Sequence, residues 1–444
     1  MHRHVTPGPR PLLALSLAAA LLGGAACRTG SPQDGAQGGP DSVPPPAGPA
    51  GRSAVLPGLE VLLRDSMHLV RGKRVGLITN QTALTSRGEH AVDVLARAPG
   101  VNLVALYGPE HGVRGNIEGG TKIENQRDSA TGVPVFSLYG RTQKPTAEML
   151  RGVDVLLFDI QDIGARPYTF VWTMAMAMEA AAAQRIPFVV LDRPNPITAA
   201  VDGPLMLPEI KRDTVGQPIT GYYPVPLRHG MTVGEVARYV NGEYGVGAEL
   251  HVVPADGWEG GAWFDEGGLP WINPSPNIRS LDAALKYSGL VLSEATNLTV
   301  GRGTDAPFSY LGAPWMDAPA VLARVRAYGL QGVRLDTVRF VPSSPDTNAW
   351  VPFRGEPVRA VRLTVTDREA FDPPYAALVL LTEIKRLHPA QFRITNEGFT
   401  QMIGSYWARQ AFDRGEDPRG IQRRWEQEVQ AWMRVRDRYR IYPR

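Results

Sequence analysis

Cysteine is nearly absent from this chain, which has a single one, Cys27, among its 444 residues. A lone cysteine cannot form an intramolecular disulfide, so no disulfide framework holds the fold. An excess of one charge is also lacking, because 47 basic residues face 44 acidic ones and the formal net charge is +3. That balance gives no reason to expect a nucleic-acid partner. With 43% hydrophobic and 20% charged residues, the composition is that of a globular protein with a sizeable core.

Several motifs with a known chemistry are missing as well. The first predicted strand is followed by Thr79 and Asn80 rather than by a G-x-G-x-x-G turn, and no P-loop occurs, which argues against a nucleotide enzyme. No G-x-S-x-G elbow supports a serine hydrolase. No C-x-x-C or H-E-x-x-H motif supports a zinc site.

The first 27 residues have the pattern of an export signal. A basic start is followed by an apolar run at residues 12–22 and by small residues up to Cys27. The apolar run is too short to span a bilayer as a mature helix. The arrangement resembles a bacterial lipoprotein signal, in which the cysteine is lipidated, although Gly24 stands where that motif prefers Leu. Plain secretion is the alternative.

Residues 28–53 are rich in proline and glycine and contain almost no apolar bulk. Such a segment cannot bury enough surface to fold, so we expect a disordered tether. Together, the signal and the tether predict an exported protein that contacts the membrane only through a lipid anchor and faces the periplasm.

The body of the chain alternates short apolar runs with helical patterns. This alternation is typical of β-α-β units in a parallel sheet with right-handed crossovers. We therefore predict a Rossmann-like domain over residues 54–285 and a second, smaller α/β domain over residues 286–444. The predicted strands of the first domain are residues 75–78, 101–107, 133–138, 153–160 and 188–191.

Polar side chains follow four of these strands. The carboxyl ends of parallel strands meet at one edge of the sheet, where ligands usually bind, so we expect these side chains to surround one crevice. In chain order they are Asn80, Glu110 with His111, Asp159 with Asp162, and Asp192 with Asn195.

Two glutamates are candidates for general acid–base chemistry. Glu110 follows a buried strand that ends at Tyr107-Gly108-Pro109, so partial desolvation of its carboxyl group is expected. Glu294 follows a predicted strand at residues 290–292 and would face Glu110 across the domain junction. Cleavage of a glycosidic bond uses such a pair of carboxylates. As alternatives, Glu110 caps a loop, and Glu294 pairs structurally with Arg302 or Arg279.

Other side chains suit the binding of a sugar that carries a carboxylate. Arg166, Arg279 and Arg302 stand in turns beside Gly or Pro, and a guanidinium fork matches a carboxylate. Tyr168 offers a face for stacking on a pyranose, with core packing as the alternative. Asp159 and Asp162, with Glu110, would suit an oxygen-rich metal site, although this spacing is also common in helix caps and ion pairs.

Eight segments of the chain together resemble the exo-β-N-acetylmuramidases of the NamZ type. The resemblance extends from about residue 70 to the C-terminus. The segments are GLITNQT (76–82), LYGPEHGVRG (106–115), TGVPVFSLYG (131–140), VDVLLFDIQDIGARPYTF (153–170), DRPNPI (192–197), RHGMTVGE (228–235), NPSPNIRS (273–280) and EATNLTVGRGTDAPF (294–308).

This resemblance implies an enzyme that removes N-acetylmuramic acid from the non-reducing end of peptidoglycan fragments. It also implies a cleft between two domains and no cofactor or metal. Glu110 is then the first candidate for the catalytic carboxylate, followed by His111, Asp159, Asp162 and Glu294. The residues expected to bind the glycan are Asn80, Arg114, Arg166, Tyr168, Asn195, Asn277, Arg279, Asn297, Arg302 and Asp305.

Two other functions fit the same residues. One is a non-catalytic lipoprotein that holds cell-wall glycan ends in the crevice. The other is a metal-dependent hydrolase built on Asp159 and Asp162. Whether the reaction inverts or retains the anomeric centre depends on the distance between the carboxylates, which spacing along the chain does not give.

Overall fold

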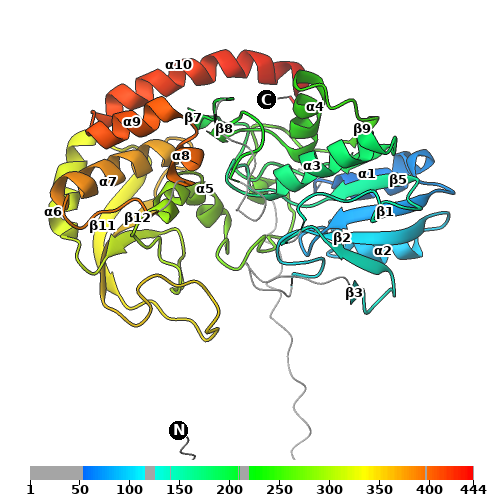
Figure 1. The fold of residues 1–444 in the computed structure, drawn as a ribbon, viewed down its shortest axis with the longest axis horizontal. Coiled ribbons are helices and arrows are strands. Elements are labelled where there is room, and N and C mark those ends of the chain that lie inside the picture. Colours follow the sequence, from blue (N-terminus) through cyan, green and yellow to red (C-terminus); the bar gives the residue numbers. More distant parts are fainter. Residues whose placement is uncertain are drawn as a thin grey trace, which may run out of the picture. The chain divides into compact units, whose positions relative to one another are not determined.

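The first half of the chain builds a twisted sheet in which consecutive parallel strands wind outward from the middle (Figure 1). In this computed structural model the order within the described part of the chain is β3-β4-β2-β1-β5-β6-β9, and all strands except the edge strand β3 are parallel. The strands are β1 (Arg74–Thr79), β2 (Asn102–Gly108), β3 (Gln126–Arg127), β4 (Pro134–Ser137), β5 (Val155–Asp159), β6 (Phe188–Leu191) and β9 (Leu250–Val253).

The winding direction reverses between β1 and β5. When the parallel strands are counted along the chain, their order is 3-2-1-4-5-6, which is that of the Rossmann fold. The predicted Rossmann-like parallel sheet is therefore confirmed. The structure describes residues 54–115, 126–140, 142–208, 210, 220–395 and 398–443. The predicted signal, Cys27 and the predicted tether lie outside these residues.

Side chains of the central strand β5 alternate between two cores. Val155 and Leu157 belong to the cluster that includes α1 (Gly58–Asp65) and α2 (Ala91–Arg97). Leu156 and Phe158 point to the opposite face, because successive side chains of a strand alternate. That face is covered by α3 (Phe170–Ala183) and α4 (Val233–Glu243). α3 is apolar nearly all round, with 11 of 14 residues buried, as expected for a helix within a core.

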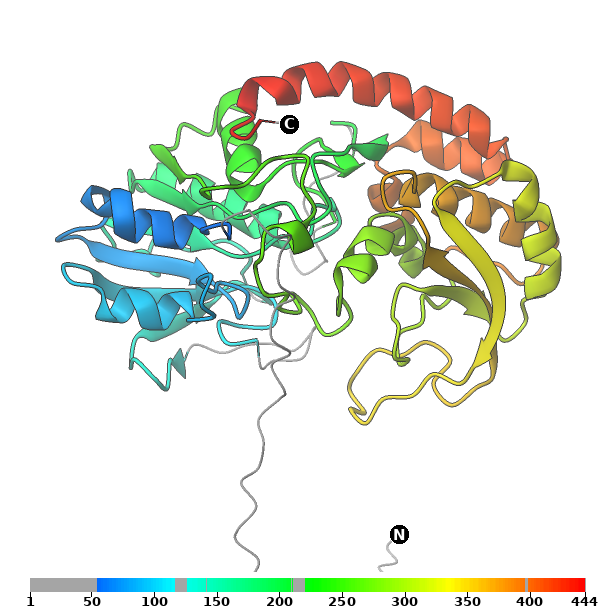
Figure 2. The same ribbon diagram turned by 180° about the vertical axis from the view of Figure 1, so that it is seen from behind.

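The second half of the chain forms a smaller α/β lobe (Figure 2). Its antiparallel sheet has the order β10-β12-β11, and α5, α6 and α7 pack on it or on each other. The bounds are α5 (Leu281–Leu290), β10 (Tyr310–Ala313), α6 (Ala318–Val325), β11 (Val333–Phe340), β12 (Val358–Val365), α7 (Pro373–Leu387), α8 (Gly398–Ile403), α9 (Tyr406–Arg414) and α10 (Pro418–Arg436). None of the helices in the described residues is long and apolar enough to cross a membrane.

The prediction of a strand at residues 290–292 is wrong. The chain there completes α5 and continues as the 3-10 helix η3 (Val291–Ala295). A short apolar run is compatible with a strand or a buried helix, and periodicity alone does not distinguish them. Gly289 shows why the helix fits, since a Cβ on it would meet the carbonyl oxygen of Pro373 at 2.0 Å. α5 therefore packs closely on the start of α7.

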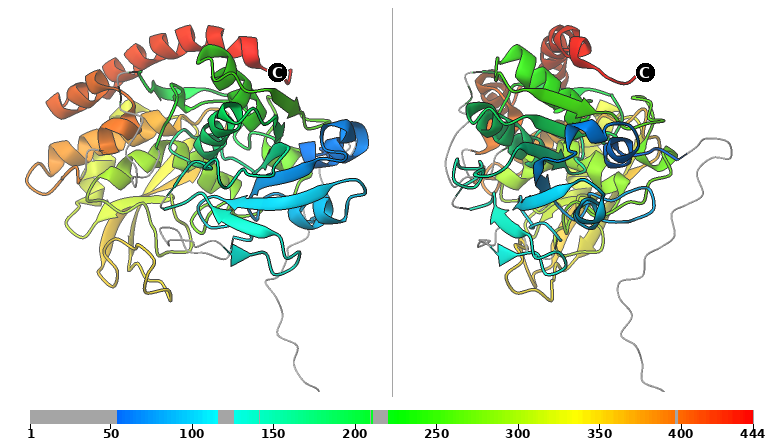
Figure 3. Two further views of the ribbon diagram at one scale, coloured as in Figure 1. Left: turned by 45° about the vertical axis from the view of Figure 1, so that its right-hand side comes forward. Right: turned by 90° about the vertical axis from the view of Figure 1, so that its right-hand side faces the viewer.

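The C-terminal segment returns to the first lobe. α10 extends from α9 to the vicinity of α4, as the views in Figures 1 and 3 show. Beyond α10, the Tyr442 hydroxyl donates a hydrogen bond to Asp192 at 2.8 Å, and the Ile441 N–H donates one to Glu235 at 2.9 Å. Asp192 follows β6 and Glu235 lies in α4, and both are buried. The two lobes belong to one compact unit.

Candidate active site

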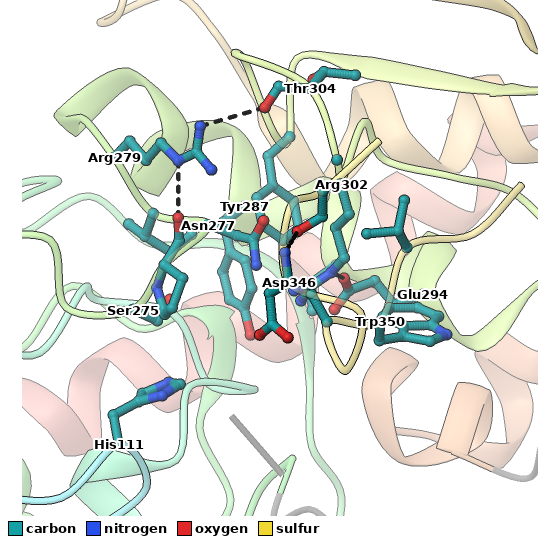
Figure 4. Close-up of a pocket in the computed structure, with 18 of the residues that line it drawn as sticks. His111, Ser275, Asn277, Arg279, Tyr287, Glu294, Arg302, Thr304, Asp346 and Trp350 are labelled. Carbon is teal, nitrogen blue, oxygen red and sulfur yellow. Dashed lines mark hydrogen bonds and ion pairs between the residues drawn. The ribbon is translucent and has the colours of Figure 1, made fainter. Parts of the chain in front are cut away.

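A pocket of about 890 Å³ opens where the ends of β2 and β4 face the smaller lobe. This volume lies toward the upper end of the range for small-molecule sites, so the pocket can hold more than one sugar ring. Glu110, His111 and Tyr139 line it from the first lobe. Figure 4 shows His111 across the pocket from residues of the smaller lobe. Polar lining residues include Tyr168, Ser275, Asn277, Arg279, Tyr287, Glu294, Arg302, Thr304, Asp305 and Asp346.

Glu110 is a half-buried carboxylate that lines this pocket. Among the residues that the structure describes, none donates a hydrogen bond to its carboxylate or forms an ion pair with it. Its charge nevertheless reaches the pocket wall. Burial raises the pKa of the Tyr168 and Tyr287 hydroxyls, and the nearby charge of Glu110 adds to both effects. A ligand in the pocket therefore meets an acidic group that, within the described residues, has no hydrogen-bond donor and no ion-pair partner.

The turn that carries Glu110 is strained. His111 has φ of 72° and the following Gly112 has φ of 75°, so two consecutive residues are left-handed. For a residue other than glycine this conformation costs about 1–2 kcal/mol, and it persists only where the surrounding structure imposes it. His111 is buried and lines the pocket. The strain is located where the sequence predicted function.

Glu294 also lines the pocket, but it is paired. Its carboxylate accepts a hydrogen bond from Nε of Arg302 at 2.6 Å. The Arg302 guanidinium lies 5.5 Å from the Phe308 ring centre and 5.2 Å from that of Trp350. Glu294 thus makes the structural pair with Arg302 that the sequence offered as the alternative. It lies at the site as a neutralised carboxylate.

Three other predicted residues contribute to the same wall. Arg279 donates hydrogen bonds to the carbonyl oxygens of Pro276 at 2.9 Å and Thr304 at 3.3 Å, and thereby joins two pocket-lining turns. Asn277 and the exposed Asp305 lie in or beside these turns. With Tyr168, these residues form a polar part of the lining of the pocket that holds Glu110.

The polar residues at the ends of β1, β5 and β6 have a different environment from that of Glu110. Asp159 is fully buried and receives two hydrogen bonds from Arg193, at 2.5 and 3.1 Å. Asp162 accepts the Gly164 N–H at 2.7 Å and lies 3.6 Å from Nε2 of His229. The structure therefore places both aspartates in the interior, and neither lines the pocket.

The two predicted amides at this edge are internal as well. The Asn80 side chain accepts hydrogen bonds from the backbone and hydroxyl of Thr82. Asn195 donates to the carbonyl oxygen of Met231 and accepts from the N–H of Ile197. These contacts hold local turns and give no support to a role in binding glycan.

Protein side chains fill the crevice where a dinucleotide lies in other Rossmann folds. Phe264 and Trp271 cover Gln161 and Arg193, and a cavity of only about 20 Å³ remains between them. This filling agrees with the missing glycine-rich turn. The metal-site alternative gains no support here, because Asp159 is paired with Arg193. In the part of the chain that the structure describes, no group of three or more His, Cys, Asp or Glu side chains is arranged to hold a metal ion.

Three predicted ligands lie away from the pocket. Arg166 is buried and donates to the carbonyl oxygens of Gln401 and Met402, and burial lowers its pKa to about 9. Arg114 bridges Asp93 and Asp128, and Asn297 bonds the backbone of residues 391 and 393. The expectation that Arg166 holds a sugar carboxylate is not supported, because its guanidinium ties α8 to the first lobe.

The sequence interpretation missed the loop of residues 341–351 after β11. Asp346 and Trp350 from this loop line the pocket. The loop contains no catalytic motif. Its available signal was a tryptophan within a stretch rich in proline, serine, aspartate and asparagine, a composition typical of a surface turn. Tyr287 was missed for a different reason, because it lies within the apolar pattern of α5.

Comparison with known proteins gives consistent matches. Residues 75–282 match the model of the N-terminal domain of exo-β-N-acetylmuramidase NamZ, and residues 285–442 match that of its C-terminal domain. The chain is 39% identical over 395 residues to a peptidoglycan β-N-acetylmuramidase NamZ of Bacillus subtilis (strain 168), covering 88% of this chain and 92% of that protein.

Two crystal structures of DUF1343-family proteins from Bacteroides fragilis NCTC 9343 have a similar fold. One has a TM-score of 0.79 at 33% identity and covers 88% of this chain and 100% of that chain. The other has a TM-score of 0.69 at 29% identity, over 88% and 99%. The likeness therefore includes both lobes.

Proposed function

Because the chain belongs to the exo-β-N-acetylmuramidase NamZ family and is a glycosidase, we propose that it releases N-acetylmuramic acid from the non-reducing end of peptidoglycan fragments. The observation that carries this proposal is the environment of Glu110. Its carboxylate, which has no ion-pair partner among the described residues, lies in a pocket that is large enough for a glycan end and is lined by two arginines and three tyrosines. This combination suits a sugar bearing a carboxylate.

Glu110 acts as the general acid in this proposal. It transfers its proton to the glycosidic oxygen as the bond to the anomeric carbon breaks. Water adds to the anomeric carbon and gives up a proton to a second carboxylate or to the base form of Glu110. Glu294 is less suited to take this proton because Arg302 neutralises it. Arg279, which donates to carbonyl oxygens and has no ion pair within the described residues, lies on the pocket wall and provides positive charge for the lactyl carboxylate of the sugar.

Location in the cell also belongs to the proposal. A lipidated Cys27 followed by a proline- and glycine-rich tether would hold the two lobes near a membrane in the periplasm. Peptidoglycan fragments are present in that compartment. The support comes from the order of sequence features, since these residues lie outside the described part of the chain.

The direct test is incubation with defined peptidoglycan fragments, followed by mass spectrometry of the released sugars. Fragments with N-acetylmuramic acid at the non-reducing end should lose that residue. Matched fragments ending in N-acetylglucosamine should remain intact. Saturable binding without any released sugar on prolonged incubation would instead identify a wall-binding protein. Loss of activity in chelator, restored by added metal, would favour the metal-dependent hydrolase.

A further inference from the structure

Large hydrophobic side chains are seldom exposed in this protein. Within the described residues they are Val341, Trp350 and Tyr406, with exposed fractions of 53%, 57% and 49%. Two of the three, Val341 and Trp350, belong to the loop of residues 341–351 and line the pocket. Exposed apolar groups that gather at one cavity indicate a binding surface, whereas scattered ones do not.

This loop is held in its conformation by its own contacts. The Arg354 guanidinium donates hydrogen bonds to the carbonyl oxygens of Ser344, Asp346 and Ala349, at 3.0, 3.1 and 2.5 Å. The Ser343 N–H donates to Gly303 at 2.8 Å, which attaches the loop to the turn that carries Arg302. A loop ordered before binding loses less conformational entropy when the ligand arrives.

The Trp350 ring combines a fixed position with an open surface. The Arg302 guanidinium lies 5.2 Å from the ring centre, and Glu294 in turn holds Arg302. More than half of the Trp350 surface still faces solvent. Figure 4 shows Trp350 and His111 on opposite sides of the pocket, with Arg302 and Asp346 between them. The indole is therefore distant from the turn that carries Glu110.

We propose that the loop of residues 341–351 forms a subsite for the sugar on the leaving-group side of the cleaved bond, with Trp350 as its stacking platform. This inference rests on the proposed function. An enzyme that removes the terminal sugar has substrate beyond that sugar in one direction only, toward the leaving group. The flat indole face matches the C–H face of a β-linked N-acetylated hexopyranose. Asp346 of the same loop also lines the pocket and can accept hydrogen bonds from sugar hydroxyl or amide groups.

The test compares two substrates on the full chain. One is a chromogenic glycoside of N-acetylmuramic acid, whose leaving group is not a sugar. The other is the disaccharide in which N-acetylglucosamine is the leaving group. For Trp350→Ala, the ratio of kcat/KM for the disaccharide to that for the chromogenic glycoside should fall about tenfold, mainly through KM. Trp350→Phe keeps a ring and should recover part of the ratio.

Tyr406→Ala is the matched control, because it removes an equally exposed aromatic ring that does not line the pocket. It should leave the ratio at the parental value. An unchanged ratio in Trp350→Ala would overturn the subsite. If kcat/KM fell equally for both substrates, that unchanged ratio would place Trp350 at the terminal sugar instead. A parent chain that releases no sugar from either substrate would overturn the proposed function and the subsite with it.

Discussion

The carboxyl edge of the parallel sheet carries acidic side chains in two different settings. After β5 and β6, Asp159 and Asp192 are fully buried and accept hydrogen bonds from several protein groups. After β2, Glu110 lies at the pocket and, within the described residues, has no such donor. We call the setting of Asp159 and Asp192 the closed edge and the setting of Glu110 the open edge. The three carboxylates occupy equivalent positions in the topology.

The difference shows that sheet topology selects an edge but not the ligand site along it. In Rossmann folds the ligand lies where the winding direction reverses, which here is between β1 and β5. Phe264 and Trp271 fill that position, and the pocket has moved to the ends of β2 and β4. The first lobe therefore provides only part of the site, and the smaller lobe provides most of the opposite wall.

The strongest test of this comparison is Glu110→Gln at the open edge. The amide keeps the shape of the side chain but has no proton to transfer. We expect kcat/KM for release of N-acetylmuramic acid to fall roughly 10²–10⁴-fold, the usual contribution of a general acid or base. The midpoint of thermal unfolding should stay at the parental value, because none of the described residues is hydrogen-bonded to or ion-paired with the Glu110 carboxylate. Near-parental activity in the folded variant would remove Glu110 from the chemistry.

At the closed edge, Arg193→Met should have the opposite effect, which is a loss of stability. It leaves the Asp159 charge buried without its partner, a change that costs about 3–5 kcal/mol of folding free energy. The midpoint of thermal unfolding should fall by roughly 5 °C. The double variant Asp159→Leu/Arg193→Met removes both charges and should be more stable than Arg193→Met. If Arg193→Met kept its parental midpoint and lost activity a hundredfold, the closed edge would take part in catalysis.

The ionisation of Asp192 at the closed edge should make the stability of the fold depend on pH. Burial raises the pKa of Asp192 to about 6 from its ordinary 3.8, although hydrogen bonds from Thr232, Gly234 and Tyr442 oppose the rise. The folded state therefore binds a proton that the unfolded state releases between pH 4 and 6. This contribution stabilises the fold below pH 4 and is lost as the pH rises through 6. Its size is at most about 3 kcal/mol.

Thermal unfolding between pH 4 and 7 checks this sign. Asp192→Asn cannot ionise, so its stability should decline less with rising pH than that of the parent. Asp154→Asn is the control, because Arg74 holds the pKa of Asp154 at about 2, below this range. Equal slopes in Asp192→Asn and the parent would contradict the assignment.

Periodicity and turn residues were enough to predict β1, β2, β4, β5 and β6 of the first lobe and the position of Glu110, but not β9 or the edge strand β3. β6 was predicted with its observed bounds, and β1, β2 and β5 with errors of one or two residues at each end. These strands are apolar runs bounded by Gly, Pro or charged residues, so local sequence specifies them. The position of Glu110 followed from the end of β2 and from the resemblance of LYGPEHG to a known family.

The pairing of side chains could not be predicted in the same way. Arg166 and Arg302 both stand in turns beside Gly or Pro, yet one ties α8 to the first lobe and the other faces the pocket. The partners of Arg166 lie more than 230 positions away along the chain, whereas Arg302 pairs with Glu294, eight positions away, which the sequence had offered as the alternative. Trp350 was missed because nothing in its local sequence distinguishes a pocket wall from an ordinary surface turn.

The C-terminal tail returns to the first lobe and contacts Asp192 and Glu235, so the end of the polypeptide stabilises its first half. The residues after α10 complete the hydrogen bonding of two buried carboxylates in the first lobe, although more than 190 positions separate the bonded residues. A fragment that stopped at the junction between the two family models would leave both carboxylates without these donors. The two lobes should therefore melt in a single transition, and neither is expected to survive excision as an independent module.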